Sequence, residues 1–231
     1  VMFLACCFNG SLCAQSDAQI YERTCDAKTY PFSDPSPVAT PNNSYYPYFR
    51  FDGFSMQAQE KQWKMVVLEN DYVKLTVTPE IGGKIWGAID KVNNKEFVYT
   101  NGVVKFRDVA MRGPWTSGGI EFNFGIIGHA PTCSTPIDYL TKKNVDGSVS
   151  CHIFSYEWIT RTVWNVEINL PKDKAYFTTH TTWFNQSSID QPYYQWMNAG
   201  YATKTGTRFY YPGTYSIGHS GDLHPYPIDE E

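Results

Sequence analysis

The sequence that decides the fold runs Arg112-Gly-Pro-Trp-Thr-Ser-Gly-Gly-Ile-Glu-Phe-Asn-Phe-Gly-Ile-Ile-Gly-His129. Its centre alternates between apolar and polar residues, which is the two-residue period of a β-strand. Three apolar side chains share one face of that strand: Ile120, Phe122 and Phe124. If this face packs into a core, Glu121 and Asn123 must lie on the opposite face. The pattern therefore predicts a strand with one apolar face and one face that is free to carry a site.

The same stretch contains five kinds of side chain that bind polar ligands. Trp115 and Arg112 precede the strand, and His129 follows it after a glycine-rich turn. Together with Glu121 and Asn123 they favour a hydroxyl-rich ligand, and we expect a saccharide or glycan. Glu121 and His129 are the candidate catalytic pair, because an apolar setting raises the pKa of a carboxyl and suits it to proton transfer. The structural alternatives are an ion pair of Glu121 with Arg112 and a loop-fixing hydrogen bond of His129.

Short strand patterns separated by turn residues recur along the chain after residue 60. The clearest patterns cover residues 64–68, 72–77, 84–89, 149–158, 161–168, 175–184 and 193–201. Turn signals between them include Glu69-Asn-Asp71, Pro79-Glu-Ile-Gly-Gly83 and Asp146-Gly147. No helical period of useful length is present. We predict an all-β fold, a large antiparallel β-sandwich with roughly seven to ten strands in two stacked sheets.

Two later segments add candidate ligand contacts. Tyr194, Trp196 and Asn198 share a strand face, where Trp196 would form a platform for a sugar ring and Asn198 would bind its hydroxyls. Core packing is the alternative for Trp196, whereas a buried amide such as Asn198 needs several partners. A glycine-rich loop carries three further candidates: His219, Asp222 and His224.

The cysteine and histidine pattern argues against a metal site. The His219–His224 loop offers no fourth partner, so sugar contact or loop packing is favoured over metal binding. Cys25, Cys133 and Cys151 follow the N-terminal segment, without a CxxC motif or a His/Cys cluster at zinc spacing. We expect no metal, no cofactor and at most one disulfide.

Composition excludes several classes of protein. The chain has 231 residues, of which 42% are hydrophobic and 18% charged, so it is globular rather than disordered. Aromatic residues reach 16%, which favours β structure. The formal net charge is −4 and no basic stripe is present, so nucleic acid is not an expected partner. No apolar run of transmembrane length follows the N-terminus.

The N-terminal part of the chain predicts export. Residues 1–14 are apolar up to Ala14 and resemble the remnant of a secretory signal, which predicts a secreted or periplasmic protein. Lipid attachment at Cys6 or Cys7, which would anchor the protein at the cell surface, is the alternative. Residues 15–60 are rich in proline and predict an extended arm with one or two short strands. Residues 61–231 would form the main domain, which we expect to be incomplete at its C-terminus.

Several motifs resemble one known superfamily. The run Leu68-Glu-Asn-Asp-Tyr-Val-Lys-Leu-Thr-Val-Thr-Pro-Glu-Ile-Gly-Gly-Lys-Ile-Trp86 resembles the opening of galactose mutarotase-like (aldose 1-epimerase superfamily) domains, where an early strand pair enters a Pro-x-x-Gly-Gly turn. Four later motifs resemble an uncharacterised, often exported bacterial subgroup, some of whose members are fused to helical repeats: Gly118-Gly-Ile-Glu-Phe-Asn-Phe124, Gly128-His-Ala-Pro131, Gln195-Trp-Met-Asn-Ala199 and Gly218-His-Ser-Gly-Asp-Leu-His-Pro225. The resemblance covers residues 60–231.

This resemblance implies a fold and a range of functions. The superfamily fold is an antiparallel supersandwich with a saccharide site on its concave face, and mutarotases use a glutamate base and a histidine acid. This chain departs from that pair around Trp196–Asn198, where the family histidine is replaced, and the late glutamate has no match up to Glu231. We therefore expect acid/base chemistry on a glycoside or sugar hemiacetal, as in a glycoside hydrolase or an aldose epimerase-like enzyme. The alternatives are a non-catalytic glycan-binding module and a structural or interaction domain of a larger protein.

Overall fold

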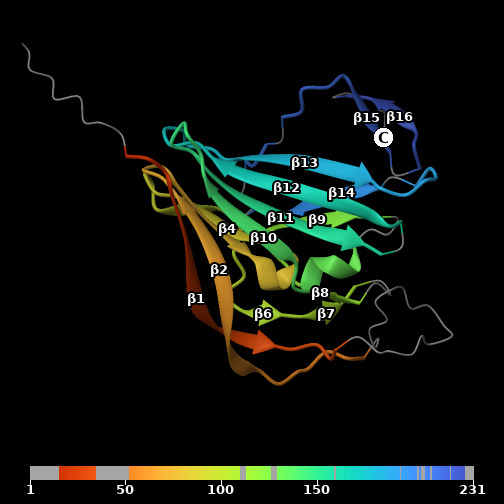
Figure 1. Cartoon of the computed structure of the whole chain (residues 1–231), viewed down its shortest axis with the longest axis horizontal. Coiled ribbons are helices and arrows are strands. Elements are labelled where there is room, and N and C mark those ends of the chain that lie inside the picture. The colour runs from red at the N-terminus through yellow and green to blue at the C-terminus, as the bar shows by residue number, and fades with distance from the viewer. Residues whose placement is uncertain are drawn as a thin grey trace, which may run out of the picture.

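The structure is a computed structural model that describes residues 16–34, 52–109, 113–125, 129–158, 160–192, 194–201, 203, 206–208, 210–218 and 220–226. It is an all-β sandwich, as predicted, and Figure 1 shows two sheets stacked face to face. The signal-like segment, residues 1–14, lies outside the described residues. No helix in the described ranges is both long and apolar enough to cross a membrane.

The larger sheet has eight strands, of which seven follow one path. Their order is β14 (Gln195–Ala199), β9 (Ile120–Phe124), β4 (Lys84–Asp90), β3 (Val73–Thr78), β2 (Gln59–Glu69), β1 (Gln19–Tyr30) and β6 (Val104–Lys105). The eighth strand, β5 (Lys95–Val98), pairs with β4. All pairings are antiparallel except β1 with β6.

The smaller sheet consists of four antiparallel strands in sequence order. They are β10 (Asp138–Lys143), β11 (Val149–Glu157), β12 (Thr162–Leu170) and β13 (Thr178–Asn185). Its inner face packs on the larger sheet through buried aliphatic and aromatic side chains. Phe124 stacks on Trp164 across the two sheets, with ring centroids 4.7 Å apart. The apolar half of the alternating stretch therefore lies in the core, as predicted.

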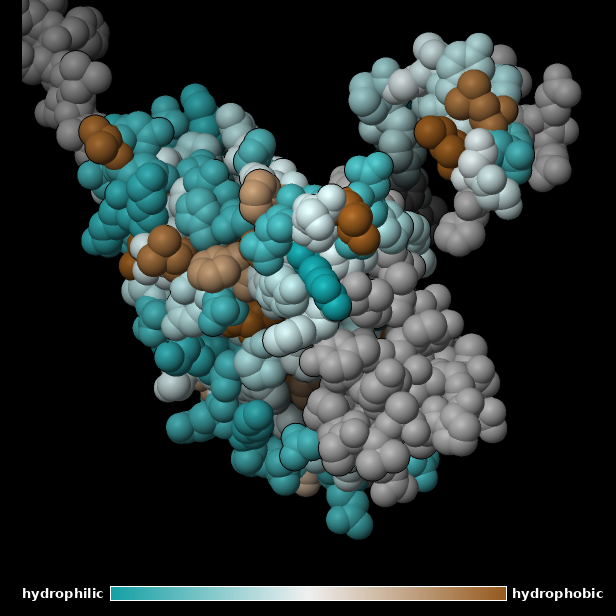
Figure 2. All heavy atoms as spheres, turned by 45° about the vertical axis from the view of Figure 1, so that its right-hand side comes forward, coloured by the Kyte–Doolittle hydropathy of each residue, from teal (hydrophilic) through white to brown (hydrophobic). Residues whose placement is uncertain are grey.

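Two short strand pairs and two 3₁₀ turns complete the described elements. The pairs are β7 (Arg107–Asp108) with β8 (Pro114–Trp115) and β15 (Tyr215–Ile217) with β16 (Leu223–Pro225). The β15–β16 hairpin stands away from the sandwich in Figure 1, and in Figure 2 the protruding lobe shows hydrophobic side chains. The hairpin carries two strongly exposed aliphatic residues, Ile217 at 74% and Leu223 at 63% exposure.

The turn after β3 positions the loop that carries His129. The turn η1 (Pro79–Ile81) ends at Gly82 and Gly83, both with a left-handed backbone that favours glycine. A Cβ atom on Gly82 would lie 2.5 Å from the carbonyl oxygen of Thr132, in the second turn η2 (Pro131–Ser134). Only glycine permits this close approach, which holds η2 against the end of β3.

The segment before residue 60 contains more regular structure than its sequence indicates. One or two short strands were expected, but β1 extends over 12 residues and pairs with β2 from Gln19↔Glu69 to Thr29↔Gln59. Most side chains of β1 are exposed, so an apolar pattern is absent and the pairing with β2 determines the strand. Residues 35–51 of the predicted arm lie outside the described residues.

Candidate functional site

The candidate site lies on the outer face of the larger sheet, which is the face turned away from β10–β13. Glu121 and Asn123 point to this side of β9, opposite the core residue Phe122, as the alternation predicted. Both polar side chains are buried, with Glu121 2% and Asn123 0% exposed. A buried carboxylate requires partners, and the surrounding residues supply them.

Three side chains donate to, or share a proton with, one oxygen of the carboxylate. The Nδ1 atom of His129 lies 2.8 Å from Oε1 of Glu121, and Nδ2 of Asn123 donates to the same oxygen over 2.7 Å. Nδ2 of Asn198 donates from the neighbouring strand β14 over 3.4 Å. The strand register explains the last contact, since Asn198 pairs directly with Glu121. The predicted proximity of Glu121 to His129 is therefore confirmed.

The second oxygen of the carboxylate faces Lys84, which the sequence did not single out. Nζ of Lys84 lies 3.8 Å from Oε2 of Glu121, and both side chains are 2% exposed. The ammonium also donates to Oγ1 of Thr116 over 3.0 Å and to the Thr116 carbonyl. The structural ion pair of Glu121 thus involves Lys84, whereas Arg112 lies outside the described residues. A lysine at the start of an apolar strand was the only sequence signal.

These partners keep Glu121 ionised. Burial by itself raises the pKa of the Glu121 carboxyl, but the hydrogen bonds from His129 and Asn123 and the charge of Lys84 together outweigh it. The net pKa lies below its ordinary value, so the raised pKa expected from the apolar setting is wrong. Burial lowers the pKa of Lys84, although the charge of Glu121 opposes this. Burial also raises the pKa of the Cys133 thiol, which stays protonated.

His129 covers the buried pair and is the more accessible member of the cluster. Its side chain is 17% exposed, and its φ of 52° is left-handed, which is uncommon for a residue with a Cβ atom. Asn123 holds this backbone in place, since its Oδ1 accepts a hydrogen bond from the amide of Ala130 over 2.7 Å. Strained backbone that is fixed by its surroundings is frequent at functional sites.

Two tryptophans flank the imidazole. The ring centroid of Trp115 lies 5.9 Å from that of His129 in an edge-to-face arrangement, and the centroid of Trp196 lies 5.1 Å away. Nε1 of Trp196 donates to Oδ1 of Asn198, which orients the amide toward Glu121. Trp196 is half-buried. This burial is intermediate between that of an exposed platform, as predicted, and that of a core residue, which was the alternative.

Two buried polar atoms of this cluster lack a hydrogen bond. Nε1 of Trp115 and Oε2 of Glu121 have no hydrogen-bond partner within the part of the chain that the structure describes. Most buried polar atoms in folded proteins form a hydrogen bond with protein or water, so buried atoms without one mark a place where a water or a ligand group fits.

The remaining candidates are not brought to this cluster. Asp222 and His224 lie at the β15–β16 hairpin, where Asp222 accepts a backbone hydrogen bond from Gly218 over 2.7 Å. His219 lies outside the described residues. Within the described ranges, no group of three or more His, Cys, Asp or Glu side chains is arranged to hold a metal ion. Cys25, Cys133 and Cys151 are free thiols.

A small cavity adjoins the His129 loop. It has a volume of about 170 Å³, and its lining includes Ala130, which follows His129 directly, together with Tyr156 and Trp158. Trp158 is 64% exposed, and its ring centroid lies 5.0 Å from that of Tyr156. Exposed tryptophan rings are enriched at binding interfaces.

Comparison with known proteins shows that this fold is similar to part of a longer protein. The structure is similar to the crystal structure of a TPR-domain containing protein from Parabacteroides distasonis, with a TM-score of 0.72 and 27% sequence identity. The match covers 80% of this chain and 32% of the other, so the chain spans about a third of the length of that protein. Residues 40–231 match the model of a domain family of unknown function, and the chain belongs to this family, DUF5107.

Proposed function

We propose that this protein binds a saccharide at the Glu121–His129 cluster and transfers a proton to or from it. The observation that supports this most is the buried, ionised Glu121 hydrogen-bonded to a more accessible imidazole that lies between two tryptophan rings. The resemblance to galactose mutarotase-like domains points to the same ligand class. The signal-like N-terminus favours action outside the cytoplasm, in the periplasm or as a secreted protein.

We assign different roles to the two groups. Nδ1 of His129 is held by Glu121, so Nε2 is the ring nitrogen that is left to exchange a proton with a ligand. The ionised Glu121 orients the ring through this contact, as a carboxylate does beside a catalytic histidine. Trp115 and Trp196 would contact the apolar faces of a sugar ring, while Asn198 would bind a hydroxyl group.

Binding without catalysis is the second candidate function, and one observation favours it. The lowered pKa of Glu121 leaves no protonated carboxyl in the cluster to act as a general acid on a glycosidic oxygen. A non-catalytic glycan module would use the two flanking tryptophans and the exposed Trp158 without proton transfer.

A saccharide panel separates the two candidates. Binding is measured by calorimetry and turnover by anomer exchange and by release of reducing sugar. We expect His129→Gln to abolish turnover and to retain most of the binding, while Trp196→Ala weakens binding. His152→Gln is the matched control, because His152 also lies beside a carboxylate, with Nε2 3.7 Å from Glu167, but on β11.

Each outcome decides between the functions. Turnover that His129→Gln removes and His152→Gln retains supports the catalytic proposal. Saccharide binding without turnover by the wild-type protein supports the glycan module. Failure to bind any saccharide contradicts both and favours a structural or interaction domain within a longer protein, such as the TPR-domain containing protein that shares this fold.

A further inference from the structure

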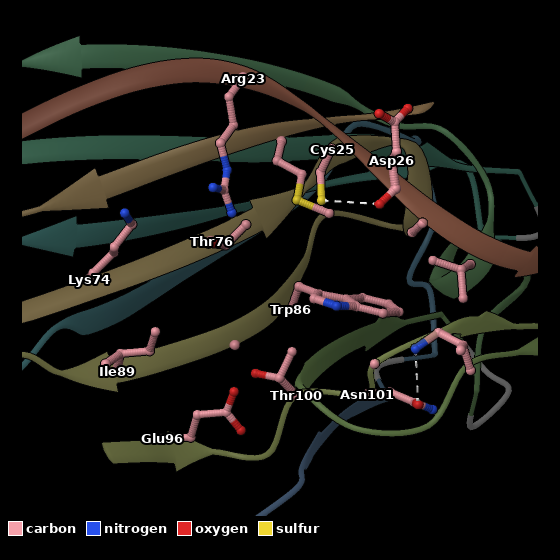
Figure 3. A pocket seen from close by; sticks show the side chains of 16 residues that line it. Arg23, Cys25, Asp26, Lys74, Thr76, Trp86, Ile89, Glu96, Thr100 and Asn101 are labelled. Carbon is pink, nitrogen blue, oxygen red and sulfur yellow. Dashed lines mark hydrogen bonds between the residues drawn. The ribbon is translucent and has the colours of Figure 1, made fainter. Parts of the chain in front are cut away.

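A second hollow lies on the outer face of the larger sheet, and its lining includes neither Glu121 nor His129 (Figure 3). We call it the Trp86 pocket and define it by six of its lining residues: Arg23, Cys25, Lys74, Trp86, Ile89 and Glu96. They come from β1, β3, β4 and β5, and the loop after β5 closes one side. Its volume is about 380 Å³, at the lower end of the range for pockets that bind small molecules.

The loop approaches β4 closely because of one glycine. A Cβ atom on Gly87 would lie 2.0 Å from Oγ1 of Thr100. The absence of a side chain at residue 87 therefore lets Thr100 and Asn101 form a wall of the pocket. Nδ2 of Asn101 donates to Oγ of Ser117 over 2.8 Å, which fixes this wall.

Two opposite charges at the edge of the pocket have no protein partner among the described residues, and both side chains are exposed to solvent. The guanidinium of Arg23 and the carboxylate of Glu96 make no hydrogen bond or ion pair with any residue that the structure describes. Figure 3 shows the two side chains entering the pocket from opposite sides. The neighbouring Lys74 differs, because its ammonium already lies 3.5 Å from Glu69. Asp26 also lines the pocket, but Figure 3 shows its carboxylate directed away from the centre of the pocket. The charges that point into the pocket without a partner in the described part of the chain are thus one cation and one anion.

The surface between these charges is partly apolar, and Thr76 and Thr100 add hydroxyl groups to it. Trp86 and Met65 belong to a buried cluster on this face of the sheet, and Ile89 extends the apolar surface toward Glu96. Apolar surface with a charged group at each end matches a molecule that has an anionic end, a cationic end and apolar groups between them. A neutral sugar would form an ion pair with neither charge.

We propose that the Trp86 pocket binds a short apolar peptide with free termini. The C-terminal carboxylate pairs with Arg23, whose guanidinium forms two parallel hydrogen bonds with such a group. The N-terminal ammonium pairs with Glu96, and the side chains contact Trp86 and Ile89. This site is separate from the proposed saccharide function, and its test needs no saccharide.

Blocked peptides test each end. The probes are L-leucyl-L-leucine, its N-acetyl form and its C-terminal amide, with affinities from calorimetry on the full chain. We expect each blocked form to bind about tenfold more weakly than the free dipeptide. The Arg23→Gln variant should bind the free dipeptide and its C-terminal amide equally well. The Glu96→Gln variant should bind the free dipeptide and its N-acetyl form equally well. Lys28→Gln and Glu60→Gln, exposed charges on β1 and β2 outside the pocket, should change neither.

The thiol of Cys25 gives a second measurement that locates the ligand. Cys25 lines the pocket and is half-buried, whereas Cys133 and Cys151 are 2% and 0% exposed. Saturating dipeptide should slow alkylation of Cys25 by iodoacetamide at least about fivefold, as followed by mass spectrometry of its peptide. No dipeptide binding at millimolar concentration, equal binding of all three probes, or binding that leaves the Cys25 rate unchanged would each overturn the proposal.

Discussion

The two faces of strand β9 are both buried but differ in chemistry. Phe122 and Phe124 enter the apolar core between the sheets, whereas Glu121 and Asn123 enter a polar cluster on the outer face. Apolar burial stabilises a fold in proportion to the area removed from water. A buried ion pair contributes little net stability, because desolvation offsets its attraction. The comparison indicates that the apolar core contributes most to holding the strand in place, whereas the outer cluster contributes little net stability.

The largest expected effect is at the core. Phe124→Ala removes a ring that stacks on Trp164 and also contacts Trp183, with centroids 5.6 Å apart. We expect a loss of about 4 kcal/mol in the free energy of unfolding, measured by urea denaturation. Phe184→Ala is the control, because Phe184 is 60% exposed and its removal should cost far less. Equal losses in the two variants would mean that the inner face does not dominate stability.

The next effect tests the ion pair of the outer cluster. Lys84→Met leaves the buried carboxylate of Glu121 without its cation, which should cost about 3 kcal/mol of unfolding free energy. Adding Glu121→Gln removes the uncompensated charge, so the double variant should be more stable than Lys84→Met alone. If the losses of the two single variants simply add, Lys84 and Glu121 do not interact.

Lowering the pH should destabilise the polar outer face of β9, because it protonates Glu121. Its pKa is lowered in the folded protein, so its ionised form contributes stability that is present above the ordinary value of 4.5. This contribution is lost as the pH falls below 4.5 through the lowered pKa. Glu121→Gln should therefore lose less stability than the wild type between about pH 5 and pH 3. Phe184→Ala should retain the wild-type slope. Parallel curves for wild type and Glu121→Gln would contradict the lowered pKa.

The smallest effect is expected where a polar contact lies near the surface. The hydroxyl of Tyr139 on β10 donates to Oε1 of Glu22 on β1 over 2.7 Å. Burial and this hydrogen bond to a carboxylate raise the pKa of Tyr139 to about 12. We expect Tyr139→Phe to lower the free energy of unfolding by about 1 kcal/mol or less. In ultraviolet titration, this variant should lose a phenol that ionises at high pH. A loss as large as that of Lys84→Met would show that burial does not explain the difference in stability expected between these two polar contacts.

Local patterns predicted the strands and the division of β9 into two faces. Glu121 and His129 are eight residues apart and joined by a turn, so their contact follows from nearby sequence. The β2–β3 hairpin around Asn70 was predicted for the same reason and is confirmed by the pairing of Leu68 with Leu75. The saccharide, the export signal and the mutarotase-like resemblance stay predictions.

Contacts between distant segments required the tertiary structure. Lys84 meets Glu121 because β4 lies beside β9, and no local pattern specifies which strands become neighbours. The pKa of Glu121 was mispredicted because the sequence did not show that His129, Asn123 and Lys84 would all contact this carboxylate, and of these only Lys84 comes from a distant strand. The sequence by itself determined an all-β chain with a polar face on one central strand, because alternation is a local property. Only the tertiary structure decided that this face is buried, charged and covered by His129, because burial and charge pairing depend on which strands become neighbours.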